Sequence, residues 1–95
     1  MAVGVLQEFE ATVEQYDQVN EKVNTGGNPP DGLILHCGGE IGGGKMRVFD
    51  IWETADAFEK FAEERLGPAI GEVMGADAAP PTVREVNELH DVIQP

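Results

Sequence analysis

The chain has 95 residues, of which 41% are hydrophobic, and its 18 acidic against 6 basic side chains give a formal net charge of −12. This excess of negative charge repels nucleic acid and anionic membrane surfaces, so neither is expected as a partner. No segment approaches the roughly 20 consecutive apolar residues of a membrane span. The length predicts a single domain over residues 1–95, small enough to gain stability from a second copy.

The start of the chain and its cysteine content both favour a cytoplasmic protein. The N-terminal sequence MAVGVLQEFE has neither the basic region nor the apolar run of a secretory signal. Cys37 is the only cysteine, so the chain cannot form an internal disulfide, which fits a reducing compartment.

The first third of the sequence predicts a strand followed by a capped helix. Residues 3–10 alternate in the manner of a strand. Thr12 and Gln15 form a T-x-x-Q capping box that begins a helix over residues 13–23. The glycines and prolines of residues 24–32 cannot continue that helix and predict a loop.

A glycine-rich hairpin follows in the middle of the sequence. Strands are predicted over residues 33–37 and 46–53, joined by residues 38–44, of which five are glycine. Lys45 comes next, but no Ser or Thr follows it and no helix begins there. A phosphate-binding loop is therefore excluded.

The two faces of this hairpin differ in chemistry. Period-two alternation places His36, Asp50 and Trp52 on one face. The other face is apolar and carries Leu33, Leu35, Cys37, Phe49 and Ile51. We therefore expect the apolar face to meet the hydrophobic core and the face with the polar side chains to line a cavity.

A long amphipathic helix and a last strand complete the chain. Thr54 is the predicted N-cap of a helix over residues 55–73. Gly67-Pro68 lies inside it, and proline lacks a backbone donor and clashes with the preceding turn, so a kink or break is expected there. Residues 82–93 are the predicted last strand.

The predicted order is βαββαβ, which is the order of a ferredoxin-like α+β domain. Two right-handed crossovers then form a four-stranded antiparallel sheet with both helices on one face. The candidate residues of the uncovered face are Leu6, Glu8, Ile34, His36, Met46, Val48, Asp50, Trp52 and His90. So much apolar area predicts a homodimer that pairs sheet to sheet through the face carrying Met46, Val48 and Trp52, as a closed barrel.

Nearly the whole chain resembles the dimeric α+β-barrel superfamily, and within it the small antibiotic-biosynthesis-monooxygenase-like domains. The resemblance rests on the strand end VFDIWE, the helix TADAFEKFAEERLGP after it, and the closing ELHDVI. It implies a sheet-to-sheet dimer with a pocket between the sheet and the helices of each subunit. It also implies small-molecule chemistry, with cofactor-independent oxygenation of polycyclic aromatic compounds and haem breakdown as activities of different members.

The resemblance also suggests site residues. Trp52 matches the pocket tryptophan of the monooxygenase members, and His36 or His90 matches a pocket histidine. The better-known oxygenases carry an asparagine close to that tryptophan, whereas Phe49-Asp50-Ile51 stands there in this sequence.

His36 and Asp50 are the candidate catalytic residues. Imidazole exchanges protons near neutral pH, so His36 is the candidate acid/base for a phenolic substrate. The alternative is a hydrogen-bonded histidine at the dimer interface. Asp50 shares its face and would orient the imidazole, or would instead pair with Arg47 or Arg84.

Trp52, Tyr16 and His90 are the candidate substrate-binding residues. The indole of Trp52 offers a broad apolar area for stacking on a planar ligand, or it seals the barrel at a strand end. Tyr16 lies on the helix side that meets the sheet, where a phenol more often packs than reacts. His90 would reach either the pocket or the dimer interface.

No metal or other cofactor is expected. The only candidate ligand set is His36, Cys37, Asp50 and His90, and adjacent strand residues point to opposite faces. The leading interpretation is a small-molecule pocket for an aromatic or polyketide-like compound, with cofactor-independent monooxygenation or a related proton transfer as its chemistry. The alternative is a non-catalytic dimeric module that binds a ligand or a protein partner.

Overall fold

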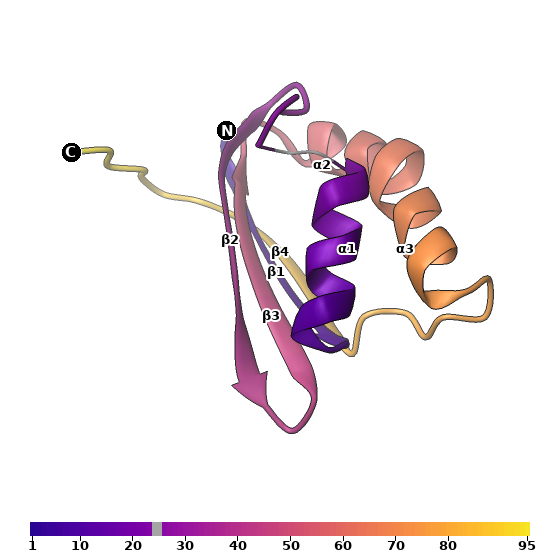
Figure 1. Ribbon diagram of the computed structural model, residues 1–95. Coiled ribbons are helices and arrows are strands. Elements are labelled where there is room, and N and C mark those ends of the chain that lie inside the picture. The colour runs from indigo at the N-terminus through magenta and orange to yellow at the C-terminus, as the bar shows by residue number, and fades with distance from the viewer. Residues whose placement is uncertain (24–25) are drawn as a thin grey trace.

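The computed structural model describes residues 1–23 and 26–95, and it has the predicted α+β architecture (Figure 1). One antiparallel sheet with the strand order β2-β3-β1-β4 carries the helices on one face. The elements in chain order are β1 Val3–Glu10, α1 Val13–Val23, β2 Leu33–Gly42, β3 Lys45–Trp52, α2 Ala55–Phe61, the π-helical turn η1 Ala62–Leu66, α3 Gly67–Met74 and β4 Val83–Glu88. The ferredoxin-like fold class is thereby confirmed.

Both predicted helix caps are present. At the start of α1 the Thr12 amide donates to Gln15 Oε1 at 2.9 Å, and the Gln15 amide donates to Thr12 Oγ1 at 3.1 Å. The Thr54 hydroxyl accepts from the Ala57 amide at the start of α2. Each cap satisfies donors that the first helical turn leaves without a partner.

The second helical region is irregular one turn earlier than predicted. The backbone stays helical through Gly67 and Pro68, and the irregularity is the π-helical turn η1 ahead of them. The Gly67 amide reaches back five residues to the Ala62 carbonyl. A wider turn before Pro68 accommodates a residue that has no amide donor and whose ring crowds the preceding turn. The chain therefore continues without the predicted break.

The strands differ from the prediction mainly at their ends. β2 extends to Gly42, and Gly43 and Gly44 make the tight reversal with φ values of 64° and 73°, which glycine adopts without strain. β4 ends at Glu88, so the second half of the predicted last strand is not part of the sheet. The segment after it leads away from the domain (Figure 1). Of the predicted loop over residues 24–32, Asn24 and Thr25 lie outside the described residues.

The helices cover the opposite face of the β2–β3 hairpin from the one predicted. Trp52 and Val5 are fully buried under them, and Met46 and Val48 are 3% and 7% exposed. The prediction that Met46, Val48 and Trp52 form the uncovered dimer face is therefore wrong. Both faces of the β2–β3 hairpin carry apolar residues, so alternation separates the faces without saying which one the helices pack on.

The register of β1 explains a related error. Val5 pairs with Asp50, so the valines of β1 share the helix-covered face with the polar side chains of the hairpin. Leu6 and Glu8 pair with Phe49 and Arg47 on the uncovered face, as predicted for these two residues, and the error is that they were grouped with His36. This uncovered face also carries Leu35, 47% exposed, and the exposed Cys37, which the sequence placed against the core.

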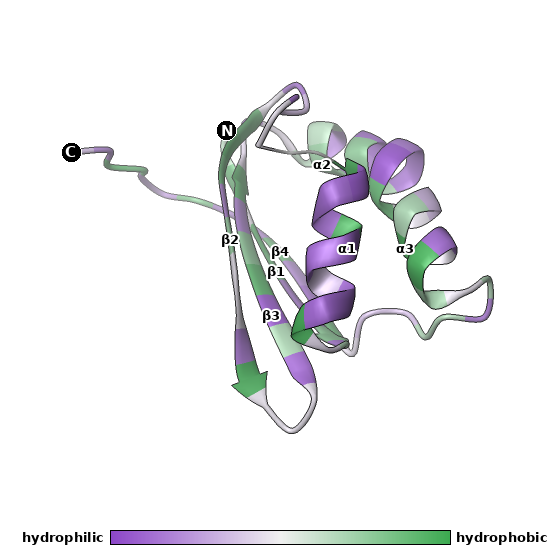
Figure 2. Cartoon of the chain, viewed as in Figure 1, coloured by the Kyte–Doolittle hydropathy of each residue, from purple (hydrophilic) through white to green (hydrophobic). Residues whose placement is uncertain are grey.

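A register shift in β2 places Leu33 and Leu35, which were expected on the same face of the sheet, on opposite faces. Leu33 pairs with Trp52 and packs on the core, whereas Leu35 pairs with Ile51, with an irregularity between them. Such a shift moves neighbouring positions onto opposite faces. In Figure 2 α1 is largely hydrophilic with apolar residues at intervals, as expected for a helix that covers a sheet with one side. No helix of the described residues has the length and apolar character needed to cross a membrane.

Candidate functional site

A small apolar cavity lies between the helices and the covered face of the sheet. Its volume is about 60 Å³, and its walls come from β1, β2, β3, α1, α2, η1 and α3. The polar residues that matter for its chemistry are Gln7, Tyr16, Asn20, His36 and Asp50, with Trp52 beside them. The volume exceeds the roughly 10–15 Å³ needed for one water, and it is less than the roughly 150 Å³ of a cavity that takes up benzene.

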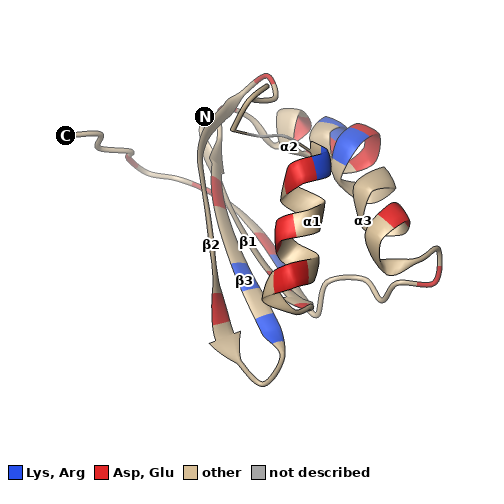
Figure 3. Cartoon of the chain, viewed as in Figure 1, with Lys and Arg blue, Asp and Glu red and all other residues tan. Residues whose placement is uncertain are grey.

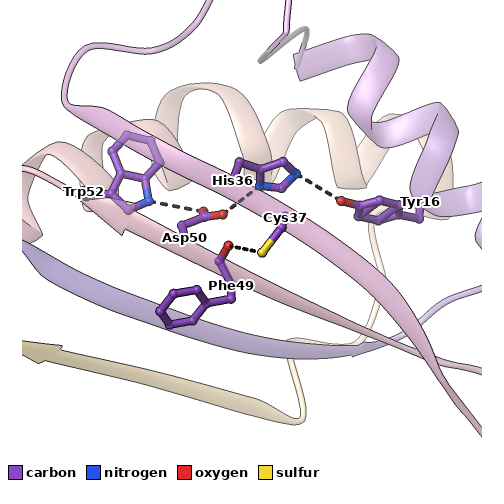
Figure 4. A network of polar contacts seen from close by, with 6 residues as sticks. All are labelled: Tyr16, His36, Cys37, Phe49, Asp50 and Trp52. Carbon is purple, nitrogen blue, oxygen red and sulfur yellow. Dashed lines mark hydrogen bonds and ion pairs between the residues drawn. The ribbon is translucent and has the colours of Figure 1, made fainter. Parts of the chain in front are cut away.

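Four side chains on the wall of this cavity form one continuous chain of hydrogen bonds (Figure 4). Trp52 Nε1 lies 3.2 Å from Asp50 Oδ2, and the other carboxylate oxygen, Oδ1, lies 2.7 Å from His36 Nδ1. His36 Nε2 lies 3.0 Å from the Tyr16 hydroxyl. The chain thus crosses from β3 to the edge strand β2 and then to α1.

The position of Asp50 follows from strand geometry. It stands directly opposite His36 in the β2–β3 pairing and two residues before Trp52 on its own strand, so all three point to the covered face. Its side chain is 4% exposed. A buried carboxylate is costly unless donors surround it, and here an indole and an imidazole each occupy one oxygen.

The hydrogen-bond chain has a definite direction. Asp50 accepts from the Trp52 indole and from His36 Nδ1–H. In neutral His36 the proton therefore sits on Nδ1, and Nε2 is left as an acceptor. Tyr16 then donates its hydroxyl proton to Nε2. The Asn20 side chain also hydrogen-bonds to the Tyr16 oxygen, so the one lone pair that remains is what the chain offers to a ligand at its end.

Tyr16 occupies space that a glycine leaves open. A Cβ on Gly38 of β2 would lie 2.7 Å from Tyr16 Cζ and closer still to the hydroxyl oxygen, so any larger residue displaces the phenol. The Tyr16 and His36 rings are nearly parallel, at 14°. At Gly39, the next position, an added Cβ meets no atom within 4 Å. The requirement for glycine is therefore local to the contact with Tyr16.

The surroundings of Tyr16 keep its hydroxyl protonated. Desolvation by burial is the main cause that raises the pKa of Tyr16 above 10.0, the Asn20 side chain acts in the opposite direction, and the charge of Asp50 raises it further. The solvent side of α1 carries the acidic residues Glu14, Asp17 and Glu21 (Figure 3). Negative charge there opposes the approach of anionic ligands.

The other sequence candidates lie elsewhere. His90 is exposed in the segment after β4 and is not among the residues that line the cavity. The arginines considered as partners of Asp50 bind other groups: Arg47 pairs with Glu8 at 2.8 Å, and Arg84 donates to Gln7 Oε1 at 2.9 Å. Within residues 1–23 and 26–95, no three His, Cys, Asp or Glu residues come together as a metal site.

Sequence reasoning missed three contributors to the site. Gln7 is 2% exposed on the cavity wall, and its signal is a polar residue at an inward position of an otherwise apolar strand. Asn20 follows Tyr16 by one helical turn and reaches the same cavity. Gly38 leaves no signal of this kind, because its importance depends on a side chain 22 residues earlier in the chain.

Comparison with known proteins supports the fold from an independent direction. No family model matches the sequence, and no curated protein matches it. Solved structures do match. A proposed antibiotic biosynthesis monooxygenase from Chloroflexus aurantiacus is 12% identical in sequence and has a TM-score of 0.70. The match covers 99% of this chain and 98% of the other chain. A Nitrosomonas europaea protein of unknown function is 16% identical over 99% of this chain and 94% of its own, also with a TM-score of 0.70.

A third similar structure has a described activity. SnoaB from Streptomyces nogalater, a cofactor-independent oxygenase, is 11% identical, covers 97% of this chain and 96% of its own, and has a TM-score of 0.69. At these identities the likeness establishes a shared fold. The chain has the ferredoxin-like α+β fold of the antibiotic-biosynthesis-monooxygenase-like proteins.

Proposed function

We propose that this chain, with its antibiotic-biosynthesis-monooxygenase-like fold, binds a hydroxylated aromatic compound in the cavity between helices and sheet and abstracts a proton from it. The observation that carries the proposal is the hydrogen-bond chain from Trp52 through Asp50 and His36 to Tyr16, set in the wall of an otherwise apolar cavity. A base next to apolar walls suits a substrate that is largely apolar and weakly acidic.

Each member of the chain has a role in this proposal. His36 is the base, and Asp50 orients its ring and stabilises the imidazolium that forms when it accepts a proton. Trp52 holds the second carboxylate oxygen. It packs at its edge on Phe58 and at a tilt on Phe61, so it is a wall of the cavity rather than an open stacking platform.

Oxygenation without a cofactor is the chemistry that we propose to follow proton removal. An electron-rich carbanion or phenolate reacts with molecular oxygen, which is the oxidant. A methylene group of the aromatic system loses two hydrogens and gains one oxygen atom, and the second oxygen atom leaves as water. The likeness of fold to SnoaB, a cofactor-independent oxygenase, supports this choice of reaction.

A ring-sized ligand requires the cavity to expand. Its volume of about 60 Å³ is below the roughly 300–1,000 Å³ of pockets that enclose drug-sized ligands. Leu66, Ile70 and Met74 line the cavity from the helical side, and methionine adapts readily to new shapes. We expect ligand binding to displace this wall from the sheet.

The sole tryptophan gives a direct test, because Trp52 lines the cavity. Naphthol, a phenol, and anthrone, a tricyclic ketone with an acidic methylene group, are titrated into the protein while its fluorescence is recorded. Oxygen uptake is followed with anthrone, without added metal or flavin. His36→Ala should abolish oxygen uptake in a chain that still folds, although the buried Asp50 carboxylate loses one of its two donors. His90→Ala is the matched control, because it removes the other histidine of the chain, which is exposed and outside the cavity.

The rival function is a non-catalytic module that binds a ligand or a protein partner. It predicts a fluorescence change with the same compounds, no oxygen uptake, and no difference between the two histidine variants. An absence of any fluorescence change would count against the pocket itself.

We further propose that the chain forms a homodimer through the uncovered face of the sheet. Leu6, Leu35, Phe49 and Ile51 share this face in the strand register, and no helix packs on it within the described residues. A second copy would bury this apolar surface. The site described above lies on the other side of the sheet, so the dimer would leave it accessible.

A further inference from the structure

We propose that Tyr16 is the group that touches the substrate, and that it relays the substrate's proton to His36 from a position that Gly38 keeps open. This inference rests on the proposed function and assigns the contact residue, the positioning residue and the class of ligand. The direct alternative is that a phenolic substrate displaces Tyr16 and meets His36 itself.

The first argument is the direction of the hydrogen bonds. When His36 is neutral with its proton on Nδ1 toward Asp50, Tyr16 is the donor to His36 Nε2. Asn20 already hydrogen-bonds to the Tyr16 oxygen, so one oxygen lone pair remains at the end of the chain. A ligand that binds there must donate a hydrogen bond, and the ligand class is therefore a hydroxyl or N–H acid rather than a carbonyl or an anion.

The second argument is the space at Gly38. The Tyr16 ring fits across β2 only because this residue has no Cβ, whereas Gly39 beside it is free of such contact. The hydroxyl is thus held against both the edge strand and the imidazole. The absence of a side chain at Gly38 allows Tyr16 to occupy this position, which favours a role for Tyr16 in the site over displacement by the substrate.

The proton transfer balances with tyrosine neutral before and after it. The O–H bond of the substrate breaks and a new O–H bond forms on the Tyr16 oxygen, while the original Tyr16 O–H bond breaks and an N–H bond forms at His36 Nε2. The products are a substrate anion and an imidazolium beside the Asp50 carboxylate. The burial that disfavours tyrosinate is consistent with a relay that never stores the charge on Tyr16.

The experiment uses para-nitrophenol, a single-ring phenol whose anion absorbs visible light, so that ionisation is seen without turnover. Binding is read from Trp52 fluorescence and ionisation from the colour of the bound probe, at a pH where the free probe is mostly neutral. The wild-type chain should bind the probe and ionise it. Tyr16→Phe should still bind it and should lose the ionisation.

Gly38→Ala and Gly39→Ala are the matched pair for the positioning role. Gly38→Ala should lose ionisation as Tyr16→Phe does, and Gly39→Ala should retain it, with thermal unfolding verifying that each variant is folded. If Tyr16→Phe ionises the bound probe as well as wild type, the substrate reaches His36 directly and the relay is wrong, while the proposed function stands. If the wild-type chain binds neither para-nitrophenol nor the larger phenols, the proposed function fails and the relay fails with it.

Discussion

His36 and Asp50 face each other across the β2–β3 ladder, with Nδ1 and Oδ1 separated by 2.7 Å. Alternation predicted that the two side chains share a face, and of the partners considered for Asp50 the structure has His36. The location of the pair differs from the prediction. The sequence placed it on the uncovered face, whereas it lies under the helices, with the Asp50 side chain 4% and the His36 side chain 23% exposed.

Asp50→Asn should destabilise the fold by about 1–3 kcal/mol, because an amide cannot accept from both the indole and the imidazole and one buried donor is left unpaired. The change is measured as the shift of the urea unfolding midpoint. Asp77→Asn is the control for loss of one negative charge, since this aspartate is exposed in the turn before β4. Equal midpoints for the two variants would contradict the structural importance of Asp50.

Trp52→Phe should destabilise the fold in a way that depends on Asp50. The substitution removes the N–H donor and keeps an aromatic ring against Phe58 and Phe61. In a double-mutant cycle with Asp50→Asn, the two losses of unfolding free energy should not add, because both substitutions break the same hydrogen bond. The coupling free energy should be roughly 0.5–3 kcal/mol. Unfolding is followed by circular dichroism, and strict additivity would mean that this bond contributes nothing.

Tyr16 should ionise at higher pH than a free tyrosine. It is the only tyrosine, so tyrosinate absorbance titrates this one group, and burial raises its pKa above 10.0. The unfolded chain releases the same proton more readily. The stability linked to this group is therefore complete below pH 10.0 and is lost as the pH rises through the raised pKa of the folded state. Tyr16→Phe should remove this part of the alkaline destabilisation, and a tyrosine that titrates at or below 10.0 would contradict its burial.

Leu35→Glu should separate the proposed dimer into folded monomers, because a charge among the apolar residues of the uncovered face cannot be buried without a partner. Leu35 is 47% exposed in the single chain, so the substitution leaves the core intact. Val13→Glu on α1, at 41% exposure, is the matched control and should remain a dimer. Sedimentation or light scattering at micromolar concentration gives the mass, and a monomeric wild type would overturn the dimer.

The sequence by itself determined the local structure of this protein. Capping chemistry set where α1 and α2 begin, paired positive-φ glycines set the β2–β3 reversal, and period-two alternation put His36, Asp50 and Trp52 on one face. These features depend on residues within a few positions of one another, or on strands joined by a short hairpin. Their geometry therefore follows from neighbouring residues.

Only the tertiary structure decided which face of the sheet the helices cover and what Tyr16 contacts. Both faces of the hairpin carry apolar residues, so local pattern could not choose between them, and the choice follows from how β1 pairs with β3 and how the crossovers pack. The contact of Tyr16 with His36 and the space at Gly38 join residues 20 and 22 positions apart on different elements. Contacts between residues this far apart in the sequence depend on how the elements pack on one another. The polar side chains that alternation assigned to a dimer interface thereby became the wall of an internal cavity.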